Sequence, residues 1–245
     1  MKNKLIITID VEKDIHSEDY LGVSEGLAKF EKLADKHKIK PILFVNADCI
    51  IKYPEIFRKL HKKGWEISLH GYSHRRFDDL PFAEKEKEIK SSLEVFEKYL
   101  HFKPKGFRAP QHSIDNQTLD LLEKYHFNYD SSYTPFNLLQ LFFFPKRFKL
   151  WFKQFFSKPN PYFIRKNLEE IPVSSLLIPP VSLIVRVFPK PILKIYFFIL
   201  QRIFKKPVFY AHSWDFIEIK ESRIDRNFSH TKFLEGLDYI MSISK

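Results

Sequence analysis

Short apolar runs alternate with longer amphipathic stretches along most of the chain. The first run, residues 4–9, consists mainly of Leu and Ile and ends at Asp10. A continuous apolar run of this length predicts a parallel strand that is covered on both faces. Six later segments predict further strands, over residues 41–45, 65–69, 105–108, 127–130, 170–174 and 207–211.

The amphipathic stretches between these strands predict helices. Ser24 and Asp115 can each cap a helix, and Pro54 suits a first helical position. Within residues 82–100, apolar positions recur at helical spacing, and we expect the charged run over residues 84–90 to form a solvated face. The predicted helices cover residues 24–38, 54–63, 82–100 and 192–204, with others starting near 115 and 230.

The order strand, helix, strand, helix predicts an α/β fold built on a parallel sheet with right-handed crossovers. Residues 136–168 and 176–191 interrupt the pattern. Prolines limit any helix within 136–168 to short pieces, and the four prolines of 176–191 predict irregular structure there. There is no internal repeat and no Gly/Ser linker. We therefore expect a single domain over residues 1–245, with residues 136–206 as an elaboration within it.

Polar residues follow several predicted strands at the point where each strand ends. Asp10, His70, Arg108, Asp130 and His212 all occupy such positions. The carboxyl ends of parallel strands meet at one edge of a sheet, and functional groups gather there. We therefore expect these five side chains to share one site.

Two histidines, His70 and His74, lie four positions apart directly after a predicted strand. On a helical turn this spacing places both imidazoles on one face, where they can bind a divalent metal if a third ligand is present. Taken alone the spacing is also compatible with two surface histidines.

The net charge of +11 comes entirely from residues 136–206. This segment has thirteen Lys and Arg against two acidic residues, and it holds thirteen of the 26 Phe. Interleaved basic and aromatic residues favour contact with a membrane surface, an anionic substrate or nucleic acid. The simpler alternative is that the Phe residues lie in the core and the basic residues form a solvated face.

Three other features bear on location. The single cysteine, Cys49, excludes an internal disulfide and fits a reducing compartment. The first residues do not resemble a signal peptide, and no run of 18 or more apolar residues occurs. We therefore expect a cytoplasmic protein without a spanning helix, with peripheral membrane contact through residues 136–206 as an open alternative.

Five ordered motifs resemble those of the polysaccharide deacetylase family (NodB homology domain, carbohydrate esterase family 4). They are Asp10-Val11-Glu12, His70-x-x-x-His74, Phe107-Arg108-Ala109-Pro110, Tyr129-Asp130-Ser131-Ser132 and Tyr210-Ala211-His212. The first motif is most similar to the branch with Asp-Val-Glu. The resemblance implies a distorted (β/α)7-type barrel with parallel strands and metal-dependent hydrolysis of an N-acyl group on a sugar.

The resemblance also implies roles for the residues. His70, His74 and Glu12 would bind a divalent metal, with zinc as the first expectation and cobalt, manganese or nickel as alternatives. Asp10 would be the catalytic base, although the opposite assignment of Asp10 and Glu12 stays open. Arg108 would orient Asp10. His212 would be the general acid, and Asp130 would pair with it.

The expected substrate is an acylated amino sugar, with an acetyl or formyl group, that can be lipid-linked or phosphate-bearing. Two alternatives remain at this point. The same fold and metal site could act on a non-sugar amide or imide, or the chain could be a non-catalytic protein that binds a membrane surface. No nucleic-acid motif is present, so we do not expect nucleic acid as a partner.

Overall fold

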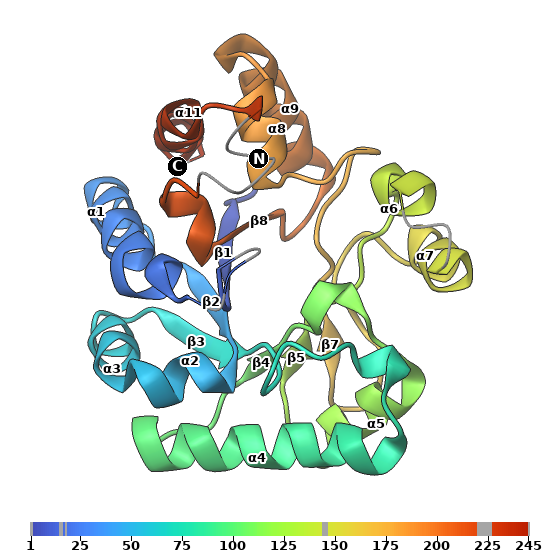
Figure 1. The fold of residues 1–245 in the computed structure, drawn as a ribbon. Helices are drawn as coiled ribbons and strands as arrows, with labels where there is room; N and C mark the ends of the chain where they lie inside the picture. Colours follow the sequence, from blue (N-terminus) through green and yellow to red (C-terminus); the bar gives the residue numbers. More distant parts are fainter. Residues whose placement is uncertain (1, 15–16, 18, 144–146, 220–226, 245) are drawn as a thin grey trace.

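One curled, mostly parallel sheet forms the centre of the molecule (Figure 1). The computed structural model describes residues 2–14, 17, 19–143, 147–219 and 227–244. The strand order is β6-β7-β5-β4-β3-β2-β1-β8, and only β6 and β7 pair in antiparallel fashion. The strands are β1 (Ile6–Val11), β2 (Ile42–Val45), β3 (Glu66–Leu69), β4 (Gly106–Phe107), β5 (Tyr129–Asp130), β6 (Tyr162–Phe163), β7 (Glu169–Glu170) and β8 (Val208–His212).

Six of the seven predicted strands are present, although most are shorter than predicted. The strand predicted over residues 170–174 overlaps β7 only at Glu170. The short antiparallel strand β6 was not predicted. With its helices on the outside, this sheet confirms the predicted distorted barrel.

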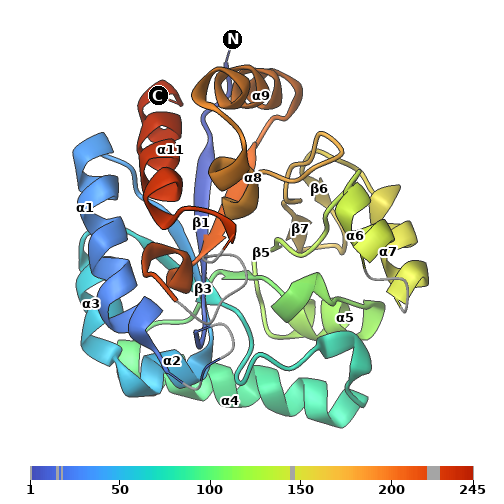
Figure 2. The same ribbon diagram turned by 45° about the horizontal axis from the view of Figure 1, so that its top comes forward.

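Helices surround the outer face of the sheet (Figures 1 and 2). They are α1 (Leu27–His37), α2 (Ala47–Lys52), α3 (Pro54–Lys62), α4 (Phe82–Leu100), α5 (Asn116–Lys124), α6 (Leu138–Phe143), α7 (Phe148–Phe155), α8 (Ser182–Val187), α9 (Lys190–Ile203) and α11 (His230–Ile243). Asp115 caps α5 as predicted, because its side chain accepts a hydrogen bond from the backbone N–H of Thr118 at 2.9 Å. Among the described residues, no helix combines the length and apolarity that crossing a bilayer requires.

Two local predictions were wrong. Residues 176–191 were expected to be irregular, but they contain α8. The charged run on α4 was expected to be fully solvated, but Lys85 and Glu88 are buried. Both side chains have polar partners: Lys85 contacts Asp115, and Glu88 binds the loop that follows β3. A buried charge is tolerated when it is paired in this way.

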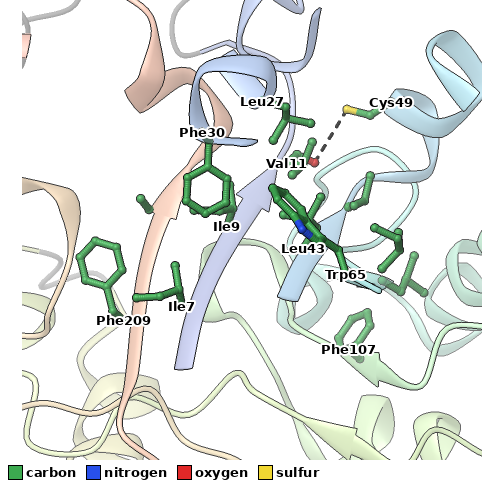
Figure 3. Close-up of a cluster of buried hydrophobic side chains, with 14 of the residues drawn as sticks. Ile7, Ile9, Val11, Leu27, Phe30, Leu43, Cys49, Trp65, Phe107 and Phe209 are labelled. Atoms are coloured by element: carbon green, nitrogen blue, oxygen red, sulfur yellow. Dashed lines mark hydrogen bonds between the residues drawn. The ribbon is translucent and has the colours of Figure 1, made fainter. Parts of the chain in front are cut away.

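The main core lies between the sheet and the helices (Figure 3). Ile7, Ile9 and Val11 of β1 point into it and are at most 2% exposed. Phe30 of α1 covers them and meets the ring of Trp65 edge-on at 5.4 Å. Each large apolar side chain buried in this way stabilises the fold by about 1.5–3 kcal/mol.

Side chains alternate across β1, so its other face is polar. Thr8, Asp10 and Glu12 alternate with the three apolar residues and point to the inner side of the curled sheet. Asp10 lies at the carboxyl end of β1, opposite His212 of β8 in the parallel register. The fold therefore brings the first and last of the predicted motifs next to each other.

Candidate active site

Glu12, His70 and His74 form a group that could hold a metal ion. One ligand atom from each residue lies within 4.8 Å of the other two. Oε2 of Glu12 contacts Nε2 of His74 and lies 3.7 Å from Nε2 of His70. Two imidazole nitrogens and one carboxylate oxygen are a ligand set typical of catalytic zinc sites, which keep a further position open. The sequence predicted these three residues together.

Hydrogen bonding fixes the ring of His70 in an orientation that suits metal binding. Its Nδ1 donates to the backbone carbonyl of Arg108 at 2.8 Å, which leaves the lone pair of Nε2 directed at Glu12. Burial lowers the pKa of His70 to about 4, so the imidazole is neutral at pH 7. Burial alone would raise the pKa of Glu12, but contact with His74 and the charges of the nearby histidines lower it to about 2. Glu12 and His70 therefore have the protonation states that a divalent cation requires.

The two histidines lie on a loop and not on the helical turn that their spacing suggested. Gly71 and His74 both have positive φ, 83° and 58°, which a helix does not allow. Glu88 of α4 holds this loop, since it accepts hydrogen bonds from the backbone N–H of Tyr72 at 3.0 Å and from Oγ of Ser73 at 3.0 Å. The sequence did not indicate this role, because Glu88 lies within a run of charged residues.

Arg108 contacts Asp10 as predicted. Nη1 of Arg108 donates to Oδ1 of Asp10 at 2.7 Å, and Nε donates to the carbonyl of Ser131 at 3.0 Å. Both side chains are buried. Burial opposes ionisation of Asp10, but the charges of Arg108 and of the nearby histidines together lower the pKa of Asp10. A buried, ionised carboxylate beside the histidine group is able to accept a proton.

The carboxylate beside His212 is Asp215, and not Asp130 as predicted. Oδ2 of Asp215 lies 3.5 Å from Nδ1 of His212, and its Oδ1 lies 3.3 Å from Nη2 of Arg186. Burial would lower the pKa of His212, but the contact with Asp215 and the charge of Glu12 raise it to about 9. His212 is thus a protonated imidazole, and its side chain is 26% exposed. A His-x-x-Asp sequence directly after a strand is the signal that could have identified Asp215.

Asp130 forms a different pair, with Glu170 of the neighbouring strand. The two residues are opposite each other in the register of β5 and β7, and both are fully buried. Oγ of Ser132 donates to Oδ1 of Asp130 at 2.6 Å. Burial raises the pKa of both carboxyl groups, and that of Glu170 rises well above its usual range. We infer that the two carboxyl groups share a proton.

Trp214 links Glu12 with His212. Its Nε1 donates to Oε1 of Glu12 at 3.3 Å, and its indole stacks on the ring of His212 with centroids 4.4 Å apart. Since Oε1 is held by this donor, Oε2 is the atom of Glu12 that faces the two histidines.

The first half of the chain matches a known protein family. Residues 2–129 match the sequence model of a family described as polysaccharide deacetylase. The chain belongs to the polysaccharide deacetylase family. The matched region contains the first three motifs, from Asp10 to Arg108, whereas His212 and residues 136–206 lie beyond it.

Two curated relatives show similarity over part of the chain. A peptidoglycan deacetylase-like protein, FGM2 of Gibberella zeae, is 27% identical over 157 residues, which are 61% of this chain and 46% of the relative. The peptidoglycan deacetylase of Helicobacter pylori is 28% identical over 107 residues, which are 44% of this chain and 36% of the relative. This polysaccharide deacetylase family member therefore spans less than half the length of these curated relatives.

Solved structures share the fold at low identity. A putative polysaccharide deacetylase from Mycobacterium smegmatis has a TM-score of 0.70 at 17% identity, over 100% of this chain and 85% of the other. Puue allantoinase has a TM-score of 0.66 at 14% identity, over 97% and 82%. A CE4 family pseudoenzyme, BA3943 of Bacillus anthracis, has a TM-score of 0.58 at 12% identity, over 99% and 60%. The fold thus occurs in proteins of different activity, and function must be argued from the site.

Proposed function

We propose that this protein is a metal-dependent hydrolase that removes an N-acyl group, acetyl or formyl, from an amino sugar. The observation that carries the proposal is the grouping of Glu12, His70 and His74 next to an ionised Asp10 and a protonated His212. Membership of the polysaccharide deacetylase family supports the sugar as the substrate class.

The three ligand residues fit a divalent ion, with zinc as the first choice and cobalt, manganese or nickel as alternatives. Oε2 of Glu12 is buried and finds no ordinary hydrogen-bond donor, and the two imidazole Nε2 atoms face it. When bound, the ion would polarise the acyl carbonyl and lower the pKa of a water molecule.

The remaining residues supply the proton transfers. Asp10 accepts the proton of the attacking water, and Arg108 keeps Asp10 ionised and fixed in place. His212, on the neighbouring strand, donates a proton to the departing amine. This assigns Asp10 as the base and Glu12 as the ligand, because Arg108 holds Asp10 whereas both histidines face Glu12.

A second candidate function is hydrolysis of a non-sugar amide or imide by the same residues. The structural likeness to an allantoinase favours keeping it under test. A third candidate function is binding without catalysis, because a pseudoenzyme shares the fold.

The test is release of acetate or formate from N-acylated amino sugars by zinc-loaded protein, compared with ring opening of cyclic amides. We expect release from the sugars only, and a loss of about 10²–10⁴-fold in kcat for Asp10→Asn. Asp120→Asn is the control, because Asp120 is an exposed aspartate paired with Arg165 on the surface. Ring opening without deacylation would replace the sugar assignment, and no turnover of either class would support a binding protein.

A further inference from the structure

Large apolar side chains are exposed mainly within residues 136–206. Among the described residues, fifteen such side chains are exposed, and twelve of these belong to this segment. The simpler alternative, in which the Phe residues of 136–206 lie in the core, is therefore wrong. Most of the twelve lie on or beside α7 and α9, which run along the outside of the fold in both views (Figures 1 and 2).

Helix α9 is apolar on two opposite faces. Leu193, Phe197 and Leu200 are buried against the body of the protein. The opposite face carries a stripe of isoleucines at helical spacing, and each is 39–60% exposed. These are Ile192, Ile195, Ile199 and Ile203. A surface helix normally presents polar residues to solvent, so the outer stripe indicates that a partner covers this face.

Helix α7 repeats the arrangement. Trp151 and Gln154 are buried, whereas Phe148, Phe152 and Phe156 are 51%, 48% and 66% exposed. The three exposed rings follow one another at spacing four, with centroids 5.4 and 4.9 Å apart. They form a second apolar stripe on the outer side of the segment.

The segments that follow the two helices meet. The backbone N–H of Lys205, two residues after α9, donates to Oδ1 of Asn160, five residues after α7, at 2.8 Å. Beside this contact lies an apolar pocket of about 390 Å³. Its lining includes Phe136, Leu177 and Ile203, which are themselves exposed. We refer to α7, α9 and this pocket as the apolar–basic surface.

The charged residues of the apolar–basic surface all have one sign. Lys149 and Lys153 lie on α7, and Lys190, Lys194 and Arg202 lie on α9, and all five are exposed. Neither helix contains an acidic residue. Exposed apolar stripes flanked by cations are the composition of helices that lie in the interface of anionic membranes.

We propose that the apolar–basic surface docks on an anionic lipid membrane. A second copy of the chain is a poorer occupant, because two acid-free cationic faces would repel each other. The inference goes beyond the proposed function and does not depend on it, since docking requires neither metal nor substrate. If both hold, the substrate is a sugar presented at a membrane on a lipid or phosphate carrier.

Vesicle sedimentation tests the proposal directly. The probes are vesicles of phosphatidylcholine alone and of phosphatidylcholine mixed with an equal part of phosphatidylglycerol. We expect binding to the anionic vesicles that is at least about tenfold stronger than to the neutral ones and that weakens with salt. Because one cation near such a surface contributes about fivefold, Lys194→Glu with Arg202→Glu should weaken binding by more than about tenfold.

Matched variants isolate the apolar contribution. Ile199→Ser is compared with Ile51→Ser on α2, since these side chains are 39% and 38% exposed. Phe152→Ser is compared with Phe82→Ser on α4, at 48% and 45% exposed. We expect each variant on α7 or α9 to weaken binding severalfold, and each control to bind like the native protein. Circular dichroism establishes that all variants are folded.

Three results would overturn the proposal. They are absence of binding to anionic vesicles, equal loss of binding in the variants and their controls, and a concentration-dependent self-association that the α9 variants abolish. The last result would assign the surface to a second copy. None of these results depends on whether the protein deacylates sugars.

Discussion

Oδ2 of Asp215 lies 3.5 Å from Nδ1 of His212 and also accepts a hydrogen bond from the backbone N–H of His212 at 2.9 Å. One buried carboxylate therefore holds the backbone of the proposed general acid by a hydrogen bond and lies within ion-pair distance of its ring. Arg186 contacts the other oxygen of Asp215 and comes from α8. Residues 136–206 thus supply a side chain, that of Arg186, which contacts the carboxylate beside His212.

Asp215→Asn removes the charge and keeps the shape of the side chain. We expect kcat to fall about 10–100-fold, because His212 loses the partner that holds its ring, while KM changes by less than about threefold. Steady-state kinetics on the preferred acylated sugar measure this. Asp238→Asn is the matched control, because Asp238 of α11 is also an aspartate beside a histidine. Its Oδ1 lies 2.7 Å from Nε2 of His37. An equal loss in both variants would contradict a specific role for Asp215.

Trp214→Phe tests how Glu12 is held. The variant loses the N–H that binds Oε1 of Glu12 but keeps an aromatic ring to stack on His212. We expect the affinity for zinc to fall about 10–100-fold, as is typical when a residue behind a metal ligand is lost. Competition with a chelator measures the dissociation constant. Trp65→Phe, in the core beside Phe30, is the control and should bind zinc as the native protein does.

Glu170→Gln tests the shared proton at the Asp130–Glu170 pair. Burial raises the pKa of Glu170, so the folded protein retains a proton that the unfolded chain releases above its ordinary pKa. Stability must then fall as the pH rises above that value, by up to about 1.4 kcal/mol per pH unit while the folded state stays protonated. Glutamine cannot ionise, so we expect the variant to lose less stability than the native protein between neutral and alkaline pH.

Urea unfolding at a series of pH values measures this difference. Glu169→Gln is the control, because it removes the same charge from the neighbouring residue, which is only paired with Lys206 on the surface. If the free energy of unfolding changes with pH in the same way in the native protein and in Glu170→Gln, the pair does not hold an extra proton.

The sequence predicted the strands and the residues at their ends because these signals are local. Each strand is a short apolar run, and Asp10, His70 and Arg108 stand at the positions where three of these runs end. In a parallel sheet such positions meet at one edge, so Glu12 and His70 could be placed together without knowing any angle between elements.

The partner of His212 could not be predicted in the same way. Four strands separate β5 from β8 in the sheet, and how far such a sheet curls depends on packing that no motif records. In the structure Asp130 pairs with Glu170, its neighbour in the sheet register, and the carboxylate beside His212 is that of Asp215. The spacing of His70 and His74 was misread for a similar reason, because the left-handed conformation of His74 has no periodic signal.

The outer face of α9 was missed because a helix can be apolar on two sides. The helix predicted over residues 192–204 is present as α9, with Leu193 and Phe197 buried and its cations exposed. The isoleucines between the cations were exposed as well, and only burial in three dimensions separates an inner stripe from an outer one.

The central claim is that Glu12, His70 and His74 bind one catalytic metal ion. Elemental analysis after zinc loading tests it in the native protein and in the double variant His70→Asn with His74→Asn. The control is His101→Asn with His126→Asn, because both histidines are exposed and, like His74, have positive φ that asparagine tolerates. The account predicts about one zinc per chain in the native and control proteins and almost none in the double variant. Zinc retained by the double variant, or absent from the native protein, would contradict it.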